Sequence, residues 1–254
     1  MSRIDTFYLA PENWQEPFVL SGHEAGHLLR VLRAKPGQTI RLFDGQGRAG
    51  LFRIIQTDRA CARLECLEMH TMDRPAQRIH LAVGFGKTSR RAWFLEKCVE
   101  LEATSVTFWQ ARRSQGRVPT MVKTSWTDNL IAGAKQSDNP FLPELDVAPG
   151  GSAEIIRRFP NTSSRYILCQ DGTPITAAEM TAPGDHAVVI GPEGGFDPDE
   201  IDAFSHAGFT KRSLGHRVLR WETAALMCLG LFFWVNSHDD GPTSDASSAA
   251  SFSL

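Results

Sequence analysis

The sequence predicts a mainly parallel α/β domain that follows a small β-rich module. Two observations predict this arrangement. From residue 79 onward, short apolar segments alternate with helix-like segments, which is typical of a parallel sheet covered by helices. Before residue 73, strand-forming segments are interrupted by one helix-like segment, which favours a small barrel-like module.

In the first module, residues 38–44 and 49–57 predict two strands. The segment Gly45-Gln46-Gly47 between them is typical of a hairpin. Residues 69–77 are polar and predict a linker to the next domain. The first module is therefore expected to end near residue 73.

The second domain has predicted strands at residues 79–83, 105–109, 166–169 and 187–190. A helix is predicted at residues 91–103. In sheets of this kind ligands bind beyond the carboxyl ends of the strands. The loops after Cys169 and Ile190 are therefore the places where a functional site is expected.

The chain has 254 residues, of which 42% are hydrophobic, so it is long enough for two domains. We expect a first domain at residues 1–73 and a second at residues 74–238. Residues 239–254 are rich in Ser, Ala and Asp and predict a disordered tail.

Cysteine usage and hydropathy indicate a cytoplasmic protein. The five cysteines form no CxxC pair and cannot all pair within one chain, so neither a disulfide framework nor a zinc ribbon is indicated. The longest apolar run, residues 224–235, is too short to span a bilayer, and the N-terminus lacks the pattern of a secretory signal. We expect no membrane partner.

Positive charge is concentrated in the middle of the chain. The formal net charge is only -2, but residues 74–124 hold ten Lys or Arg against three Asp or Glu, a balance of +7. Clustered cations on a nearly neutral protein favour a phosphate-backbone partner, because counterion release depends on clustering. An ordinary solvated cationic face is the alternative.

One motif points to a different class of protein. The segment His23-Glu24-Ala25-Gly26-His27 matches HExxH, in which two histidines bind zinc and the glutamate activates water. However, Ser21 and Glu24 also have the spacing of a capping box, which gives Glu24 a structural role. No downstream motif supplies a third ligand, so we expect no metal and keep a zinc peptidase as an alternative.

A second motif has the setting of a phosphate-binding loop. Residues 84–88, with the sequence GFGKT, follow a predicted strand and precede a predicted helix. A Walker A loop requires glycine where this chain has Leu81, which argues against a nucleotide triphosphatase. Lys87, Arg90 and Arg91 are left as candidates for binding RNA phosphates.

Two glycine-containing loops follow strands in the same domain. Residues 191–196, with the sequence GPEGGF, come directly after the strand at 187–190, and Asp197, Pro198 and Glu200 then fit the N-cap, N1 and N3 positions of a helix. Glycines allow the backbone to approach a ligand closely. A tight turn between strand and helix would explain the same residues.

The second loop, LGHRVLRWETA at residues 214–224, follows a possible strand at 209–213 and opens a strongly apolar helix. Arg217, Arg220 and Glu222 lie at the start of this helix. Salt bridges around a helix start are the alternative role for them, because an acidic residue interacts favourably with the helix dipole there.

Taken together, these motifs resemble the ribosomal RNA small subunit methyltransferase E family, which is of the SPOUT class. The resemblance covers residues 5–236. The segments that carry it are HLLRVLR from His27, GQTIRLFDG from Gly37, EKCVELEATSV from Glu96, GPEGGF from Gly191 and LGHRVLRWETA from Leu214.

The resemblance implies a PUA-like β-barrel domain followed by an α/β methyltransferase domain with a trefoil knot, a rare exception to the usual topology rules. It also implies methylation of N3 of a uridine in small-subunit (16S) ribosomal RNA, S-adenosylmethionine as cofactor, and a homodimer. The cofactor-binding residues that it implies are Leu168, Ile190, Gly191, Gly194, Gly195, Leu214, Gly215, Arg217, Val218, Leu219 and Thr223.

Methyl transfer to N3 of uridine requires an unpaired base and loss of the N3 proton. Arg220 is the candidate for stabilising the uracil anion, and Glu193 or Glu222 is the candidate proton acceptor. The expected RNA-binding residues are Arg30, Arg33, Lys87, Arg90, Arg91, Arg112 and Arg113. A noncatalytic RNA-binding module is the remaining alternative.

The chain departs from the family pattern at three places: Thr6, where an arginine is common; Glu102, where ELG usually supplies a glycine; and residues 135–139, KQSDN, where an EQxxR-like segment is usual. We expect these positions to lie on surfaces that face RNA or a partner subunit.

Overall fold

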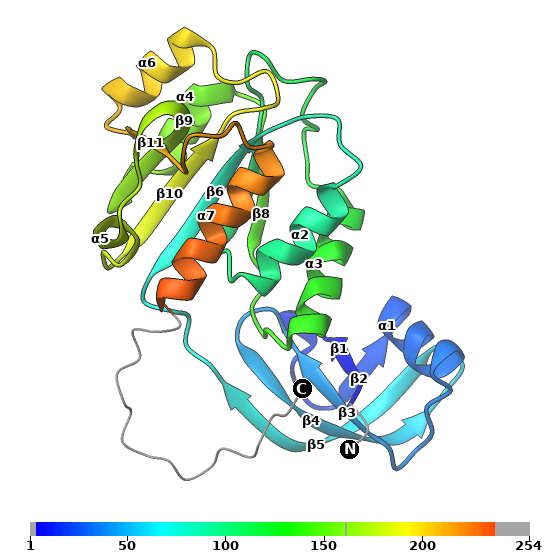
Figure 1. Ribbon diagram of the computed structural model, residues 1–254. Coiled ribbons are helices and arrows are strands. Elements are labelled where there is room, and N and C mark those ends of the chain that lie inside the picture. The colour runs from blue at the N-terminus through cyan, green and yellow to red at the C-terminus, as the bar shows by residue number, and fades with distance from the viewer. Residues whose placement is uncertain (1–3, 161, 237–254) are drawn as a thin grey trace.

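The computed structural model describes residues 4–160 and 162–236 of the chain, which form two sheets with their associated helices (Figure 1). The expected tail at residues 239–254 lies outside the described residues.

The first sheet is built from residues 6–71. Among the described residues it has five strands in the order β1 (Thr6–Tyr8), β3 (Thr39–Phe43), β4 (Arg48–Thr57), β5 (Cys61–Thr71) and β2 (Phe18–Ser21). The predicted hairpin is confirmed, because β3 and β4 pair antiparallel with Phe43 opposite Ala49. The predicted linker begins too early: residues 69–71 belong to β5 and pair with residues 48–50 of β4.

Aromatic and aliphatic side chains fill the core of this first part. Phe18 and Phe52 form a T-shaped contact with 5.0 Å between ring centroids, and Trp14 makes T-shaped contacts with both rings. Leu28 is buried in the same core. It comes from a short helical segment, α1 (Gly22–Gly26) continued by the π-helix η2 (His27–Val31), and a 3-10 turn, η1 (Pro11–Asn13), precedes β2.

The capping box predicted at Ser21 and Glu24 is wrong. Ser21 occupies the N-cap position of α1 but makes no side-chain capping hydrogen bond. The Glu24 carboxylate instead accepts the backbone N–H of Tyr8 at 2.9 Å and pairs with Lys135 of the second domain at 2.9 Å. A tertiary ion pair has therefore replaced the local hydrogen bond that the sequence pattern favours.

The second sheet confirms the predicted parallel arrangement. In the part of the chain that the structure describes, it has six strands in the order β11 (Thr210–Ser213), β9 (Ser164–Pro174), β10 (Asp185–Ile190), β6 (Arg78–Gly84), β7 (Ser105–Trp109) and β8 (Glu144–Ala148). Every neighbouring pair is parallel. The strand predicted at 166–169 is longer than expected, because β9 continues beside β11 to Pro174.

Helices cover both faces of this sheet (Figure 1). The helices on one face are α2 (Arg91–Glu100), α3 (Thr124–Ser137) and α7 (Trp221–Asn236), and those on the other are α4 (Gly151–Arg158) and α6 (Pro198–His206). Alternate residues of β10 point to opposite faces of the sheet. Val188 and Ile190 pack in the core with α2, α3 and α7, whereas Ala187 and Val189 pack in the core with α4 and α6. A short helix, α5 (Ala177–Met180), packs against α7.

Helix α2 ends at Glu100, three residues before its predicted end, because the chain turns into a left-handed conformation at Glu102 (φ 57°). No helix in the described ranges is long and apolar enough to cross a membrane.

The three departures from the family pattern lie near the contact between the two parts of the molecule. Thr6 donates a hydrogen bond to Asp138 at 3.4 Å, and Arg41 pairs with the same carboxylate at 3.4 Å. Glu102 and residues 137–139 line one cavity of about 310 Å³ beside this contact. These positions therefore belong to the junction between the two sheets.

Candidate functional site

A cavity of about 840 Å³ opens where β10 and β11 end and α7 begins, beside the middle of β9. Its wall is formed by residues 87–90, 168–171, 190–193, 195–196, 213–215, 217–222 and 224, together with Ile201 of α6. The segments around residues 87–90, 190–196 and 213–224 follow the carboxyl ends of β6, β10 and β11, where a site was expected. Residues 168–171 lie within β9, where Leu168 pairs with Ile190 at the end of β10. We refer to this cavity as the pocket.

The pocket brings together most of the residues that the resemblance implied for cofactor binding. Those in its wall are Leu168, Ile190, Gly191, Gly195, Leu214, Gly215, Arg217, Val218 and Leu219. Gly194 and Thr223 are not in the wall. Gly194 lies against Arg113, and Thr223 is exposed on the first turn of α7.

The glycines around the pocket are required for two different structural reasons. Gly195 (φ 72°) and Gly215 (φ 129°) adopt left-handed conformations that side chains rarely tolerate, and the space beside each is open. Gly84, at the end of β6, lies so close to Gly191 and Pro192 that a Cβ would be 2.4 Å from the Pro192 nitrogen. Neighbouring strand ends therefore approach each other closely beneath the pocket.

The helix start predicted after the first loop is confirmed. Asp197 is the N-cap of α6, Pro198 is the first helical residue, and Glu200 completes a capping box. The box fixes the point at which the loop from Gly191 leaves the pocket and enters α6.

The three catalytic candidates have different surroundings. Arg220 is exposed in the pocket wall just before α7. Glu193 is also exposed in the wall, where its Oε1 accepts the indole N–H of Trp221 at 3.1 Å. Glu222 is only 4% exposed, and its carboxylate accepts a hydrogen bond from Arg90 Nη1 at 3.0 Å.

Two of the expected RNA-binding cations lie in the pocket wall. Lys87 is exposed there, and Arg90 is half exposed while it pairs with Glu222. Arg30 and Arg33 are exposed on and just after η2 in the first part of the molecule.

Arg91 has a largely internal position. Its guanidinium packs over the rings of Phe85 at 4.5 Å and Trp126 at 5.1 Å and donates to the Gly86 carbonyl. Burial lowers the pKa of Arg91, and the nearby Glu193 opposes this effect. Arg91 is therefore placed to order the loop between β6 and α2.

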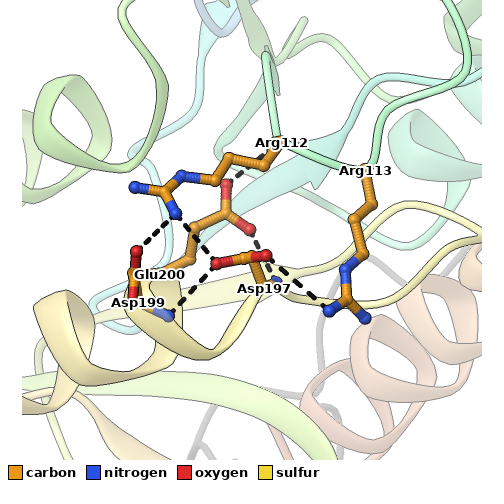
Figure 2. Close-up of polar contacts among 5 residues, drawn as sticks. All are labelled: Arg112, Arg113, Asp197, Asp199 and Glu200. Atoms are coloured by element: carbon orange, nitrogen blue, oxygen red, sulfur yellow. Dashed lines mark hydrogen bonds and ion pairs between the residues drawn. The ribbon is translucent and has the colours of Figure 1, made fainter.

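Arg112 and Arg113 are engaged in ion pairs at the start of α6 (Figure 2). Arg112 pairs with Asp197 at 3.0 Å and with Asp199, and Arg113 pairs with Asp197 at 3.7 Å. Both arginines are thus held beside the loop that follows β10.

The HExxH segment shows no metal-binding geometry. Among the described residues, no group of three or more His, Cys, Asp or Glu side chains is close enough to hold an ion. Glu24, the residue that would activate water, is bound to Lys135. The zinc peptidase alternative therefore receives no support.

Several pocket residues were not predicted. Asp171 and Phe196 line the wall, and Trp221 binds Glu193. A signal existed for Asp171, because it lies just beyond the predicted strand end. The contact between Trp221 and Glu193 joins residues 28 positions apart and has no local signature.

Two family patterns match this chain. Residues 73–232 match the RNA methyltransferase domain, and residues 20–65 match the RNA methyltransferase PUA domain. The fold, the pocket and these matches define the class of protein as an RNA methyltransferase with a PUA domain.

Curated proteins and solved structures narrow the class. The ribosomal RNA small subunit methyltransferase E of Mycobacterium bovis is 28% identical over 239 residues, covering 89% of this chain and 90% of the relative. A probable rRNA methyltransferase from Porphyromonas gingivalis is 30% identical, with a TM-score of 0.82, and the match covers 92% and 99% of the two chains.

A ribosomal RNA small subunit methyltransferase E from Neisseria gonorrhoeae, solved with bound S-adenosylmethionine, is 28% identical, with a TM-score of 0.75 and coverage of 89% and 95%. The chain belongs to the ribosomal RNA small subunit methyltransferase E family.

Proposed function

We propose that this protein transfers a methyl group from S-adenosylmethionine to N3 of a uridine in small-subunit (16S) ribosomal RNA. The observation that carries the proposal is the pocket, in which the two glycine-containing loops after β10 and β11 meet residues 168–171 of β9. The bound S-adenosylmethionine of the Neisseria relative supports the same cofactor here.

The residues of the pocket fit this cofactor. Leu168, Ile190 and Leu219 supply apolar surface suited to an adenine ring. The open backbone at Gly195 and Gly215 can offer amide and carbonyl groups to the polar parts of the molecule. S-adenosylmethionine supplies a methyl group activated by its attachment to a sulfonium.

The protein has to align N3 of the uridine with the methyl group and to stabilise the negative charge that develops on the base. N3 of uridine becomes nucleophilic only when its proton leaves, and the negative charge then spreads onto the neighbouring carbonyl oxygens. Arg220, exposed in the pocket wall, is placed to stabilise that charge.

Of the two candidate proton acceptors, Glu193 is the better placed. Its side chain is exposed in the pocket wall, and the bond from Trp221 orients it. Glu222 is buried and engaged with Arg90, which favours a role in positioning Arg90 at the pocket mouth.

RNA is proposed to bind across both parts of the molecule. Arg30 and Arg33 contact phosphates from the first part, and Lys87 and Arg90 do so at the pocket. Arg91 packs inside the molecule and contributes mainly by ordering the loop between β6 and α2. Arg112 and Arg113 are exposed but paired with acidic residues at the start of α6, so their contribution to RNA binding is proposed to be smaller.

The remaining features are proposed on the family resemblance: closure of the first sheet into a PUA-like barrel, a trefoil knot in the second domain, a homodimer and a cytoplasmic location. Exposed apolar side chains at the pocket rim and on α7, such as Val218 at 79% and Met227 at 40% exposure, support a second subunit at this place.

The proposal is tested by methyl transfer to ribosomal RNA from cells that lack the protein. Purified protein is incubated with S-adenosylmethionine carrying a labelled methyl group and with small-subunit RNA, either free or assembled in subunits. The label is expected in a single N3-methyluridine. Label in another nucleoside would contradict the N3 assignment, and no transfer to either substrate would favour a noncatalytic RNA-binding module.

A further inference from the structure

The loop after β7, residues 110–118, packs behind the pocket without lining it. A Cβ at Gly194 would lie 3.0 Å from both Cβ and the carbonyl oxygen of Arg113, so the two loops are in direct backbone contact. On its other side, Gly116 lies close to the side chain of Lys87, which belongs to the pocket wall. The β7 loop therefore supports the wall from outside at two places.

This loop has a defined shape. Gln110 Oε1 accepts the backbone N–H of Val118 at 2.8 Å, and its Nε2 donates to the Gly116 carbonyl at 3.2 Å. Ser114 Oγ accepts the N–H of Ala111 at 3.1 Å. Internal hydrogen bonds of this kind make the β7 loop a firm surface against which the neighbouring loop can rest.

One buried carboxylate joins the two loops (Figure 2). Glu200 is 3% exposed. Its Oε1 accepts the backbone N–H of Arg112 at 2.8 Å, and its Oε2 accepts the backbone N–H of Asp197 at 3.0 Å. Hydrogen bonds to an ionised carboxylate are among the stronger ones in proteins, and a buried N–H that loses its partner is costly.

The side chains of Arg112 and Arg113 add exposed ion pairs outside the buried hydrogen bonds of Glu200. Arg112 and Arg113 are 59% and 49% exposed, and their pairs with Asp197 and Asp199 are open to solvent. Ion pairs at such exposure contribute little. The buried bonds of Glu200 are therefore the part of the contact that holds the loops together.

We propose that Glu200 is a positioning residue that sets the affinity for S-adenosylmethionine by holding the glycine loop at residues 191–195 against the β7 loop. The inference rests on the proposed function. A loop with three glycines has many conformations available to it, and ordering it on ligand binding costs affinity. Glu200 fixes the end of that loop before the cofactor arrives, which reduces this cost.

The test compares Glu200→Gln with the wild type by calorimetric titration of S-adenosylmethionine. The amide has nearly the same shape but has a single acceptor oxygen, so one of the two backbone N–H groups loses its partner. The Kd for S-adenosylmethionine is expected to rise about tenfold or more, and the KM for the cofactor with it. The kcat at saturating cofactor should stay within about twofold.

Arg112→Ala is the matched control, because it removes the exposed ion pairs and keeps the backbone N–H that Glu200 binds. Its Kd is expected to stay within about twofold of the wild type. A rise in Kd as large as that in Glu200→Gln would overturn the proposal that the buried hydrogen bonds of Glu200, and not the exposed ion pairs, hold the loops together.

Gly194→Ala provides a second variant that leaves Glu200 intact. Its Cβ would press on Arg113 and separate the two loops, so a several-fold rise in Kd is expected. Wild-type affinity in both Glu200→Gln and Gly194→Ala would overturn the inference, as would a loss of kcat with unchanged Kd. Failure of the wild-type protein to bind S-adenosylmethionine would instead overturn the proposed function and the inference that rests on it.

Discussion

At the scale of the residue, the lack of a side chain at Gly86 makes room for the carboxylate of Glu193. A Cβ at Gly86 would lie 2.3 Å from Glu193 Oε2 and 2.7 Å from Oε1. The same carboxylate accepts the indole N–H of Trp221, so it connects the ends of β6 and β10 with the start of α7. A side chain at Gly86 that displaces Glu193 is therefore expected to shift Trp221 and the preceding residue, Arg220.

We expect Gly86→Ala to lower the single-turnover rate of methyl transfer about tenfold or more, because it displaces Glu193 from the reacting centre. Rapid-quench measurement with labelled cofactor checks this. Gly230→Ala on α7 is the control, since a Cβ there meets nothing within 4 Å. Equal rates in the two variants would argue against a positioned Glu193.

The proposed anion-stabilising role of Arg220 has its own test. Arg220→Ala should slow single-turnover methyl transfer by about 10²–10³-fold, as loss of one transition-state hydrogen-bond donor does in other enzymes. The cofactor Kd should change little. Arg217→Ala, in the same pocket wall, should affect the transfer rate less. An unchanged rate in Arg220→Ala would remove that residue from the mechanism.

Local signals predicted some residues of the site and could not predict others. The glycines of both loops predicted a close approach of the backbone to a ligand, and their positive φ at Gly195 and Gly215 is a conformation that glycine adopts without strain. Asp197 carries a capping signature. The pair Arg90 and Glu222 joins residues 132 positions apart. Such partners depend on how the strands are ordered, and no short segment encodes that.

At the scale of the element, the same capping pattern gave two outcomes. Asp197 and Glu200 form the predicted box, whereas Ser21 and Glu24 do not. The difference is tertiary: Glu200 can bind its own helix start and the β7 loop together, but Glu24 is taken by Tyr8 and Lys135. A capping pattern thus predicts a helix start correctly only where the distant partners of its side chains leave the capping hydrogen bonds in place.

Strand β10 makes stability depend on pH. His186 is fully buried beside Phe232, its Nε2 lies 2.8 Å from the Ala182 carbonyl, and burial lowers its pKa, while the carbonyl contact and Asp185 oppose that shift. Burial also lowers the pKa of His80 on the neighbouring strand. Both imidazoles therefore resist protonation in the folded protein.

The sign of the effect follows from linkage. Above the unfolded-state pKa of about 6.5, both states are neutral and the full stability is present; as pH falls below it, the unfolded chain gains protons first. The free energy of unfolding should fall by about 1.4 kcal/mol for each unit by which a folded-state pKa is lowered. Urea unfolding between pH 7.5 and pH 5 should show this, and His186→Gln should reduce the slope. A slope unchanged by that substitution would contradict the role of His186.

At the scale of the whole molecule, the two sheets meet through a few specific contacts. Lys135 of α3 pairs with Glu24 of α1 and lies 5.3 Å from the Phe7 ring, and Phe141 forms isolated β-bridges with Gly45 and Gln46. The sequence predicted the two parts and the parallel sheet of the second. It could not predict their contact, because periodicity reports the face that an element buries and not the element that it meets.

We expect Lys135→Met to lower the free energy of unfolding by about 1.5–3 kcal/mol, because it removes a charged hydrogen bond from a largely buried pair. It should also raise the KM for RNA and leave the cofactor Kd unchanged, since the pocket lies elsewhere. Denaturant unfolding and steady-state kinetics measure these quantities. Arg53→Met, which breaks an exposed pair with Glu65, should cost less than about 1 kcal/mol. Similar losses in both variants would contradict a special role for the contact with Glu24.

S-adenosylmethionine is proposed to bind in the pocket, which lies at the ends of β10 and β11 and beside the middle of β9. Calorimetric titration of the purified wild-type protein with S-adenosylmethionine tests this proposal most directly, with Gly215→Val as a variant whose side chain is strained at φ 129° and projects from a loop of the pocket wall. We predict saturable binding by the wild type and a Kd at least about tenfold higher in the variant. No binding by the wild type, or equal binding by both proteins, would contradict the proposal.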